Sequence, residues 1–165
     1  MSFEEIRVIT IVYLAVFLPL LIYFTNRSKL PTWIPSFYIV SIVVCALGWE
    51  LWFTYGWLDG DAVNIRRSEA LNTWLPKNIN WLMNSMGDAG AVLCGGVWLM
   101  WITHKKDPIV FKKWKWSAFS IFLIWCIGQN ILVEMFLYHD QLADDKLLSW
   151  APLSPFGPYF NPILF

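Results

Sequence analysis

The sequence predicts an all-α integral membrane protein, in which four transmembrane helices form a bundle and an irregular, proline-rich C-terminal segment follows them. The first observation is composition: 58% of the residues are hydrophobic and 15% are charged, which is far more apolar than a soluble domain of this length. The second is length, because four apolar runs reach the roughly 20 residues that a helix needs to cross a hydrocarbon layer of about 30 Å. We therefore expect residues 1–165 to form a single, multi-pass transmembrane domain.

The four helices are expected at about residues 6–24, 34–57, 81–103 and 117–138. The first run has neither a basic region before it nor an A-x-A site after it, so we interpret it as a membrane helix rather than a cleaved signal peptide. Pro19 should kink this helix, which a bilayer tolerates where neighbouring helices cover the freed carbonyl.

The C-terminal segment, residues 147–165, is apolar but has a proline every three or four residues. Because proline lacks the backbone donor that a helix requires, this segment should not form a regular span. We expect a re-entrant or interfacial segment, and the alternative is the irregular start of a further helix.

Basic residues are distributed unevenly among the connections, and this distribution predicts orientation. Arg27 and Lys29 lie in the first connection, and five lysines lie between the third and fourth helices. On the other face, both termini and the 58–80 connection mix basic residues with many acidic ones. Because lysine and arginine concentrate on the cytoplasmic side, we expect both termini to lie outside.

Charge and motif composition exclude several classes of function. Twelve basic residues balance twelve acidic ones, so no cationic surface suggests nucleic acid as a partner. The three cysteines lie far apart in apolar runs and make neither a disulfide framework nor a CxxC metal motif. His104 and His139 are expected at opposite faces of the membrane, and the Glu-x-x-His spacing of bundle di-metal sites does not occur. We expect neither a metal nor another cofactor.

Three carboxylates lie inside the predicted helices: Glu50, Asp88 and Glu134. An ionisable group in a bilayer helix is costly unless it is paired or neutralised, so such groups usually face the interior of the bundle. Because successive helices run in opposite directions, all three fall in the half of the membrane nearer the termini, and their depths agree within about two helical turns. They predict a polar layer inside the bundle.

Polar neighbours reinforce this layer. Each of them lies one helical turn from a carboxylate, a spacing that places the two side chains on one face. They are Asn84 before Asp88, Asn130 before Glu134, Thr54 after Glu50 and Tyr138 after Glu134. We interpret the layer as a polar cavity in which carboxylates bind or protonate a ligand. The alternative is that these groups hydrogen-bond the helices to one another or to another subunit.

Three short strings resemble the EXPERA family, the emopamil-binding-protein-like sterol isomerases and their relatives. ALGWELWF is similar to that family's acidic second-helix motif, with Glu50 as its glutamate, and NSMGDAGAVLCGGVWL resembles the next acidic helix, with Asp88 offset by one residue. GPYFNPIL is similar to the late asparagine motif, which falls on Asn161. The chain departs from the family at Ala46, where a histidine is expected, and at Leu164, where a tryptophan is expected. The WE string in an early helix is also similar to the transmembrane terpene cyclases, and both resemblances imply acid chemistry on an apolar ring precursor.

The leading hypothesis is a lipid-modifying enzyme, an isomerase or cyclase acting on a sterol-like or isoprenoid substrate that reaches it from the bilayer. The candidate catalytic residues are Glu50 or Asp88 as proton donor and Glu134 with Asn130 as proton acceptor. The candidate substrate-binding residues are Trp49 and Trp52, whose ring faces would stabilise positive charge, together with Asn84, Thr54 and Tyr138. The rival hypothesis is a non-catalytic small subunit of a multi-subunit membrane complex, in which the polar layer and the proline-rich tail are docking surfaces.

Overall fold

The computed structural model describes residues 1–57, 60–133 and 137, and within these ranges the chain forms helices and connections without a β-strand. The predicted all-α class is therefore confirmed. In chain order the elements are α1 (Phe3–Asn26), α2 (Ile34–Leu47), α3 (Trp49–Tyr55), α4 (Val63–Arg66), α5 (Glu69–Trp74), α6 (Lys77–Gly87), η1 (Asp88–Cys94), α7 (Gly95–Thr103), η2 (Pro108–Phe111) and α8 (Trp116–Leu132).

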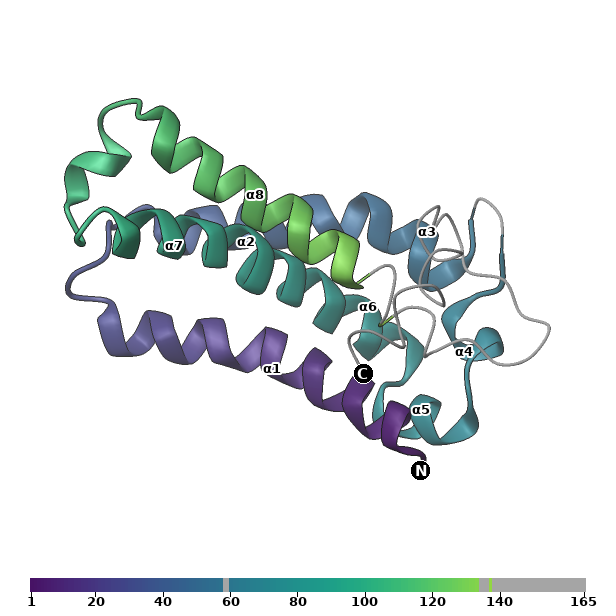
Figure 1. Ribbon diagram of the computed structural model, residues 1–165. Coiled ribbons are helices and arrows are strands. Elements are labelled where there is room, and N and C mark those ends of the chain that lie inside the picture. Colours follow the sequence, from purple (N-terminus) through teal and green to yellow (C-terminus); the bar gives the residue numbers. More distant parts are fainter. Residues whose placement is uncertain (58–59, 134–136, 138–165) are drawn as a thin grey trace.

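The long helices run along the length of the molecule and alternate in direction (Figure 1). α1 leads away from the N-terminus, α2 and α3 return, α6 to α7 lead away again, and α8 returns beside α7. The short helices α4 and α5 gather at the end that holds the N-terminus, and the connections 27–33 and 104–115 lie at the other end.

Among the described residues, two helices are long and apolar enough to cross a membrane: α1, with 24 residues, and the continuous helix Lys77–Thr103 formed by α6, η1 and α7, with 27. α2 and α3 would together make a third, although they are bent by 47° at their junction. α8 has 17 residues in the described part of the chain. The described residues thus support two or three spans where the sequence predicts four. The C-terminal segment 147–165 lies outside the described residues.

The second predicted helix, 34–57, is not continuous, and Gly48 is the reason. Its backbone has φ −92° and ψ −122°, outside the helical region. A Cβ atom at this position would lie 2.7 Å from the carbonyl oxygen of Val44, so only glycine fits without a shift. The break redirects α3 and buries the side chains of Glu50, Phe53 and Thr54.

α1 begins earlier than predicted because of a capping box at its start. The Ser2 hydroxyl accepts the Glu5 backbone N–H at 3.2 Å, and the Glu5 carboxylate accepts the Ser2 N–H at 2.7 Å. Glu5 also accepts a hydrogen bond from the Ser68 hydroxyl, which joins the start of α1 to the start of α5. The helix continues through Pro19 to Asn26.

The third long helix contains a π-helical segment, η1, that begins at Asp88. π-Helical turns are rare and often occur at functional sites. Gly87, the last residue of α6, and Gly90 of η1 both lie against α1. An added Cβ would lie 3.2 Å from the Ala15 side chain at Gly87 and 3.0 Å from the Pro19 ring at Gly90. α1 therefore packs closely against η1.

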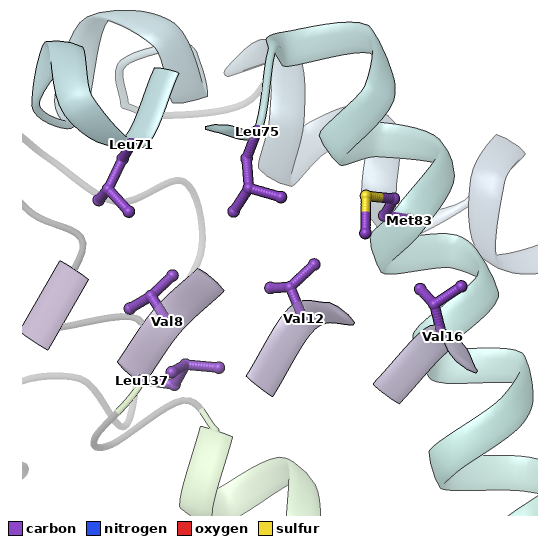
Figure 2. Close-up of a cluster of buried hydrophobic side chains, with 7 residues drawn as sticks. All are labelled: Val8, Val12, Val16, Leu71, Leu75, Met83 and Leu137. Atoms are coloured by element: carbon purple, nitrogen blue, oxygen red, sulfur yellow. The ribbon is translucent and has the colours of Figure 1, made fainter. Parts of the chain in front are cut away.

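A cluster of buried apolar side chains fixes α1 against the short helices (Figure 2). α1 contributes a stripe of valines spaced four residues apart, as expected for one face of a helix. The members of the cluster are Val8, Val12, Val16, Leu71, Leu75, Met83 and Leu137. α5 and the start of α6 thus close one end of the bundle over the first half of α1.

A second apolar cluster lies at the opposite end and joins the two basic connections. Trp101, Val110 and Ala118 form its buried part, and Leu30 from the first connection packs against it. The Trp33 and Phe111 rings also meet edge to face, with their centroids 5.6 Å apart. The two basic connections therefore lie at the same end of the bundle, as the sequence predicts.

Candidate functional site

Glu50 and Asp88, from two different helices, meet inside the bundle. The Glu50 side chain is 1% exposed, and the two carboxyl groups are close enough to interact electrostatically. The Trp49 ring nitrogen donates to Asp88 Oδ2 at 2.7 Å. The Thr54 hydroxyl donates to Glu50 Oε2 at 3.3 Å, and Asn84 forms a further side-chain hydrogen bond with Glu50. These five residues are called the carboxyl cluster below.

Helical spacing explains why these residue types meet. Trp49 and Glu50 are adjacent on α3 and point about 100° apart, so one can reach Asp88 while the other lies deeper. Asn84 and Asp88 lie one turn apart on the face of α6 and η1 that faces α3. Hydrogen-bond donors thus surround both carboxyl groups, as buried polar groups require.

Three members of the carboxyl cluster, Glu50, Asn84 and Asp88, form part of the wall of a groove of about 680 Å³. Residues of α1, α2, α3, α6, η1, α7, η2 and α8 supply its lining, which is mostly apolar. The carboxyl and amide groups that line it are Glu50, Asn84, Asp88 and Gln129, and no lysine or arginine is among the described lining residues. Leu14, Leu18 and Ile39 line the groove and are also exposed at the surface, so the groove opens sideways between the helices.

Aromatic rings also line the groove, although they are not the ones that the sequence suggested. Tyr38, Trp98 and Trp125 are lining residues, whereas Trp49 and Trp52 are not. The Trp125 ring nitrogen donates to the Ala91 carbonyl of η1 at 2.9 Å, and the Tyr38 hydroxyl donates to the Met86 carbonyl at 3.4 Å. These hydrogen bonds hold two of the rings against the helix that carries Asp88.

A buried arginine that sequence reasoning missed lies beside the cluster. Arg66 has no exposed surface, its guanidinium carbon lies 3.9 Å from the centroid of the Phe53 ring, and it donates to the Phe53 carbonyl at 2.8 Å. Its charge interacts with that of Glu50. Arg66 is adjacent to Arg67 in a connection that the sequence marks as polar, and such a pattern ordinarily indicates a solvated loop. Its burial depends on how α4 packs against α3.

The structure places the predicted site residues unequally. It brings together Trp49, Glu50, Thr54, Asn84 and Asp88. Trp52 is 37% exposed. Asn130 is exposed, and its amide donates to the Cys126 carbonyl of its own helix at 2.7 Å. Glu134 and Tyr138 lie outside the described residues, as does Asn161. The catalytic and substrate-binding roles of all these residues stay predictions.

The arrangement combines three properties. Two carboxyl groups can exchange protons with a bound molecule, the groove can hold an apolar body, and the groove opens sideways between the helices. Within the described ranges, no group of three or more histidine, cysteine, aspartate or glutamate side chains is placed to hold a metal ion. The chemistry that these residues can perform on their own is proton transfer.

Comparison with known proteins gives no relative from which function could be transferred. No family model matches the chain, and neither a curated protein nor a solved structure matches it. The resemblances to the EXPERA family and to the transmembrane terpene cyclases therefore depend on their short motifs alone, and the function has to be argued from the groove and the carboxyl cluster.

Proposed function

We propose that this chain is a membrane-embedded lipid-modifying enzyme, an isomerase or cyclase that uses the Glu50 and Asp88 carboxyl groups on a sterol-like or isoprenoid substrate. The observation that supports it most is the meeting of these two carboxyl groups in the wall of an apolar, laterally open groove. Ionisable groups are rare inside membrane helices and are by default functional-site candidates. The π-helical segment that begins at Asp88 is a second, independent sign of a functional site.

The groove favours a neutral lipid with a large apolar body. Its volume of about 680 Å³ lies within the roughly 300–1,000 Å³ typical of small-molecule sites. The described lining has no lysine or arginine to bind a phosphate headgroup. A phospholipid is therefore a poor candidate, whereas a sterol-like or isoprenoid molecule needs only an apolar groove and a small polar contact.

The proposed reaction moves one proton in and one proton out. One member of the pair donates its proton to a carbon of the substrate double bond, which leaves a carbocation on the adjoining carbon. The other member removes a proton from a neighbouring carbon, so the double bond has shifted and the pair again holds one proton. The faces of Tyr38, Trp98 and Trp125 would stabilise the transient positive charge, in place of the rings that the sequence suggested.

The proposal includes four membrane crossings. α1, the bent pair α2 and α3, and Lys77–Thr103 supply three of them. The predicted fourth span, 117–138, includes α8, which returns beside α7 (Figure 1). Three alternating crossings place both basic connections at one end of the bundle, and the fourth returns the chain toward the end that holds the N-terminus.

The decisive experiment asks whether the purified full-length chain transfers a solvent proton to lipid carbon. The protein, in mild detergent, is incubated in deuterated water with the neutral lipids of the membrane from which it was purified, and these lipids are analysed by mass spectrometry. We expect deuterium at carbon in one class of lipid. Glu50→Gln or Asp88→Asn should slow its incorporation by at least about a hundredfold, because general acid–base catalysis contributes about 10²–10⁴-fold.

Matched variants separate catalysis from folding. Glu69→Gln removes an exposed carboxylate on α5 and should leave the rate unchanged. Glu134→Gln tests the acceptor that the sequence suggests. All variants are compared by their unfolding midpoints. Incorporation by Asp88→Asn at the wild-type rate would overturn the proposal. Recovery of stoichiometric partner chains without lipid, and without deuterium incorporation, would instead favour the non-catalytic subunit.

A further inference from the structure

A second cavity is lined in part by the connection 104–115, which lies at the end of the bundle away from the N-terminus (Figure 1). It has a volume of about 390 Å³ and lies between α2, α7, η2 and α8. Its walls are largely apolar and include the rings of Trp33, Phe37, Phe111, Phe119 and Phe122. Trp33 meets both Phe37 and Phe111 edge to face, at centroid distances of 5.7 and 5.6 Å, so part of this wall is a packed aromatic surface.

Three lysines line the same cavity: Lys112, Lys113 and Lys115. Within the described part of the chain, none of them forms an ion pair with a carboxylate. The two connections at this end carry seven lysines and arginines, and their one acidic residue is Asp107. Asp107 accepts the Ile109 backbone N–H at 2.9 Å and so caps η2. The cavity therefore has a positively charged rim that no carboxylate of the described residues neutralises.

Tryptophans place this rim at the level of lipid headgroups. Trp114 and Trp116, which flank Lys115, are 66% and 71% exposed. Their rings meet edge to face with centroids 5.2 Å apart, and both contact Phe119 of the cavity wall. Exposed tryptophan beside lysine is typical of the membrane–water interface. The apolar part of the cavity then lies on the acyl-chain side of the lysines.

We propose that this cavity is a specific binding site for one anionic glycerophospholipid. The ammonium groups of Lys112 and Lys113 bind the phosphate of the headgroup, and the aromatic wall receives the upper part of an acyl chain. Basic pockets between membrane helices bind anionic headgroups in this way. The apolar wall selects a lipid over free phosphate, and the lysines select an anionic lipid over a neutral one. The site adjoins the groove, with which it shares Val97 and Phe111, but it does not include the carboxyl cluster and does not depend on the proposed enzymatic function.

The chain offers a matched pair of double variants for the test. Lys112→Gln/Lys113→Gln neutralises two lysines that line the cavity, whereas Lys105→Gln/Lys106→Gln neutralises two lysines of the same connection that do not. Both variants lose the same net charge. Each lysine near an anionic membrane surface contributes binding free energy, so the loss of two of them should weaken the affinity for an anionic lipid by about thirtyfold at low salt. If the site is specific, this loss should occur only in the cavity variant.

The measurement is native mass spectrometry of the full-length chain released from nanodiscs that contain phosphatidylglycerol in phosphatidylcholine. We expect one retained phosphatidylglycerol per wild-type chain, about thirtyfold weaker retention in Lys112→Gln/Lys113→Gln, and a change of less than about threefold in Lys105→Gln/Lys106→Gln. Glycerol phosphate, which has the headgroup chemistry but no acyl chain, should not displace the lipid. Circular dichroism checks that both variants are folded.

Three results would overturn the proposal. Equal losses in the two double variants would show a diffuse electrostatic attraction with no site. Equal retention of phosphatidylcholine would show that the cavity does not select charge. Displacement of the lipid by glycerol phosphate at comparable concentration would show a phosphate site that does not use the apolar wall. None of these results bears on deuterium transfer at the carboxyl cluster, so the two proposals can fail separately.

Discussion

Arg67 is a buried cation held by three neutral acceptors. It is 4% exposed, and it donates to Asn72 Oδ1 at 2.9 Å, to Asn80 Oδ1 at 3.0 Å and to the Leu75 carbonyl. Burial, with a smaller contribution from the charge of Arg66, lowers the pKa of Arg67 to about 10. Because the pKa of Arg67 is lower in the folded protein than in the unfolded chain, burial of its charge lowers the free energy of unfolding throughout the neutral range. This cost is relieved only as the pH rises through about 10.

Arg67→Lys should therefore destabilise the protein although it preserves the charge. A lysine cannot reproduce the guanidinium fork, so at least two of the three hydrogen bonds are lost. Hydrogen bonds to charged groups contribute about 1.5–3 kcal/mol each, so the loss of two of them should lower the free energy of unfolding by about 3–6 kcal/mol. Arg27→Lys, at an exposed position in the first connection, is the control and should change it by less than about 0.5 kcal/mol. Equal, small changes in the free energy of unfolding at both positions would contradict the view that the hydrogen bonds of Arg67 hold α5 and α6 together. The measurement is unfolding in mixed micelles.

Single residues differ in how far the sequence predicts their roles. Glu50 and Asp88 stand out because a charged group inside an apolar run has few explanations. The sequence gives no comparable signal for Arg66 and Arg67, because charged residues in a polar connection are usually solvated. Their burial results from tertiary packing of α4 and α5, which no local pattern specifies.

The π-helical segment η1 joins three other helices through its backbone. Its carbonyl at Ala91 accepts the Trp125 ring N–H at 2.9 Å, and its glycine at Gly90 lets the Pro19 ring of α1 come close. α2 also packs against it. The segment therefore determines how α1 and α8 are placed around the groove.

Gly90→Ala should loosen the contact between α1 and η1. The added Cβ would lie 3.0 Å from two atoms of the Pro19 ring, which is rigid and cannot rotate away. Overpacking of this kind costs about 1–3 kcal/mol and outweighs the gain of up to about 1 kcal/mol that alanine brings in helix propensity. We expect a net loss of about 1–2 kcal/mol in the free energy of unfolding.

Gly128→Ala is the matched control on α8. A Cβ at this position meets nothing within 4 Å, so the propensity gain is unopposed and the unfolding free energy should stay the same or rise. Both variants are measured by denaturant titration in mixed micelles. If Gly128→Ala lowered the free energy of unfolding as much as Gly90→Ala does, the effect at Gly90 would come from replacing a glycine in these helices and not from the close approach of α1.

At the scale of elements, hydropathy predicts helices but not their interruptions. Three apolar runs correspond closely to α1, to Lys77–Thr103 and to the described part of α8. The break at Gly48 and the π-helical turns after Asp88 are invisible to hydropathy, because neither changes the apolar character of the run. Both irregularities are adjacent to members of the carboxyl cluster. The local departures from regular helix thus coincide with the candidate site, as is common where function competes with regular structure.

At the scale of the whole molecule, charge asymmetry and fold agree. The two connections that the sequence assigns to one face lie together in the structure and share an apolar cluster. α4, α5 and the start of α1 form the other end. The groove could not be predicted from the sequence, because its walls come from eight helical segments whose relative placement depends on side-chain packing.

Orientation is the last prediction, and it belongs to the whole molecule because it depends on both ends at once. Cys45, Cys94 and Cys126 are first replaced by alanine, and one exposed cysteine is then introduced at Ser28 or at Thr73, at opposite ends of the bundle. With the basic end cytoplasmic, a membrane-impermeant maleimide should label Thr73→Cys in intact cells and Ser28→Cys only after permeabilisation. Both substitutions leave all lysines and arginines in place, so the charges that set orientation are unchanged. The reverse pattern would invert the orientation and place the lysine-lined cavity outside. Labelling of both positions from one side would mean that α2 and α3, which lie between them, do not carry the chain across the membrane.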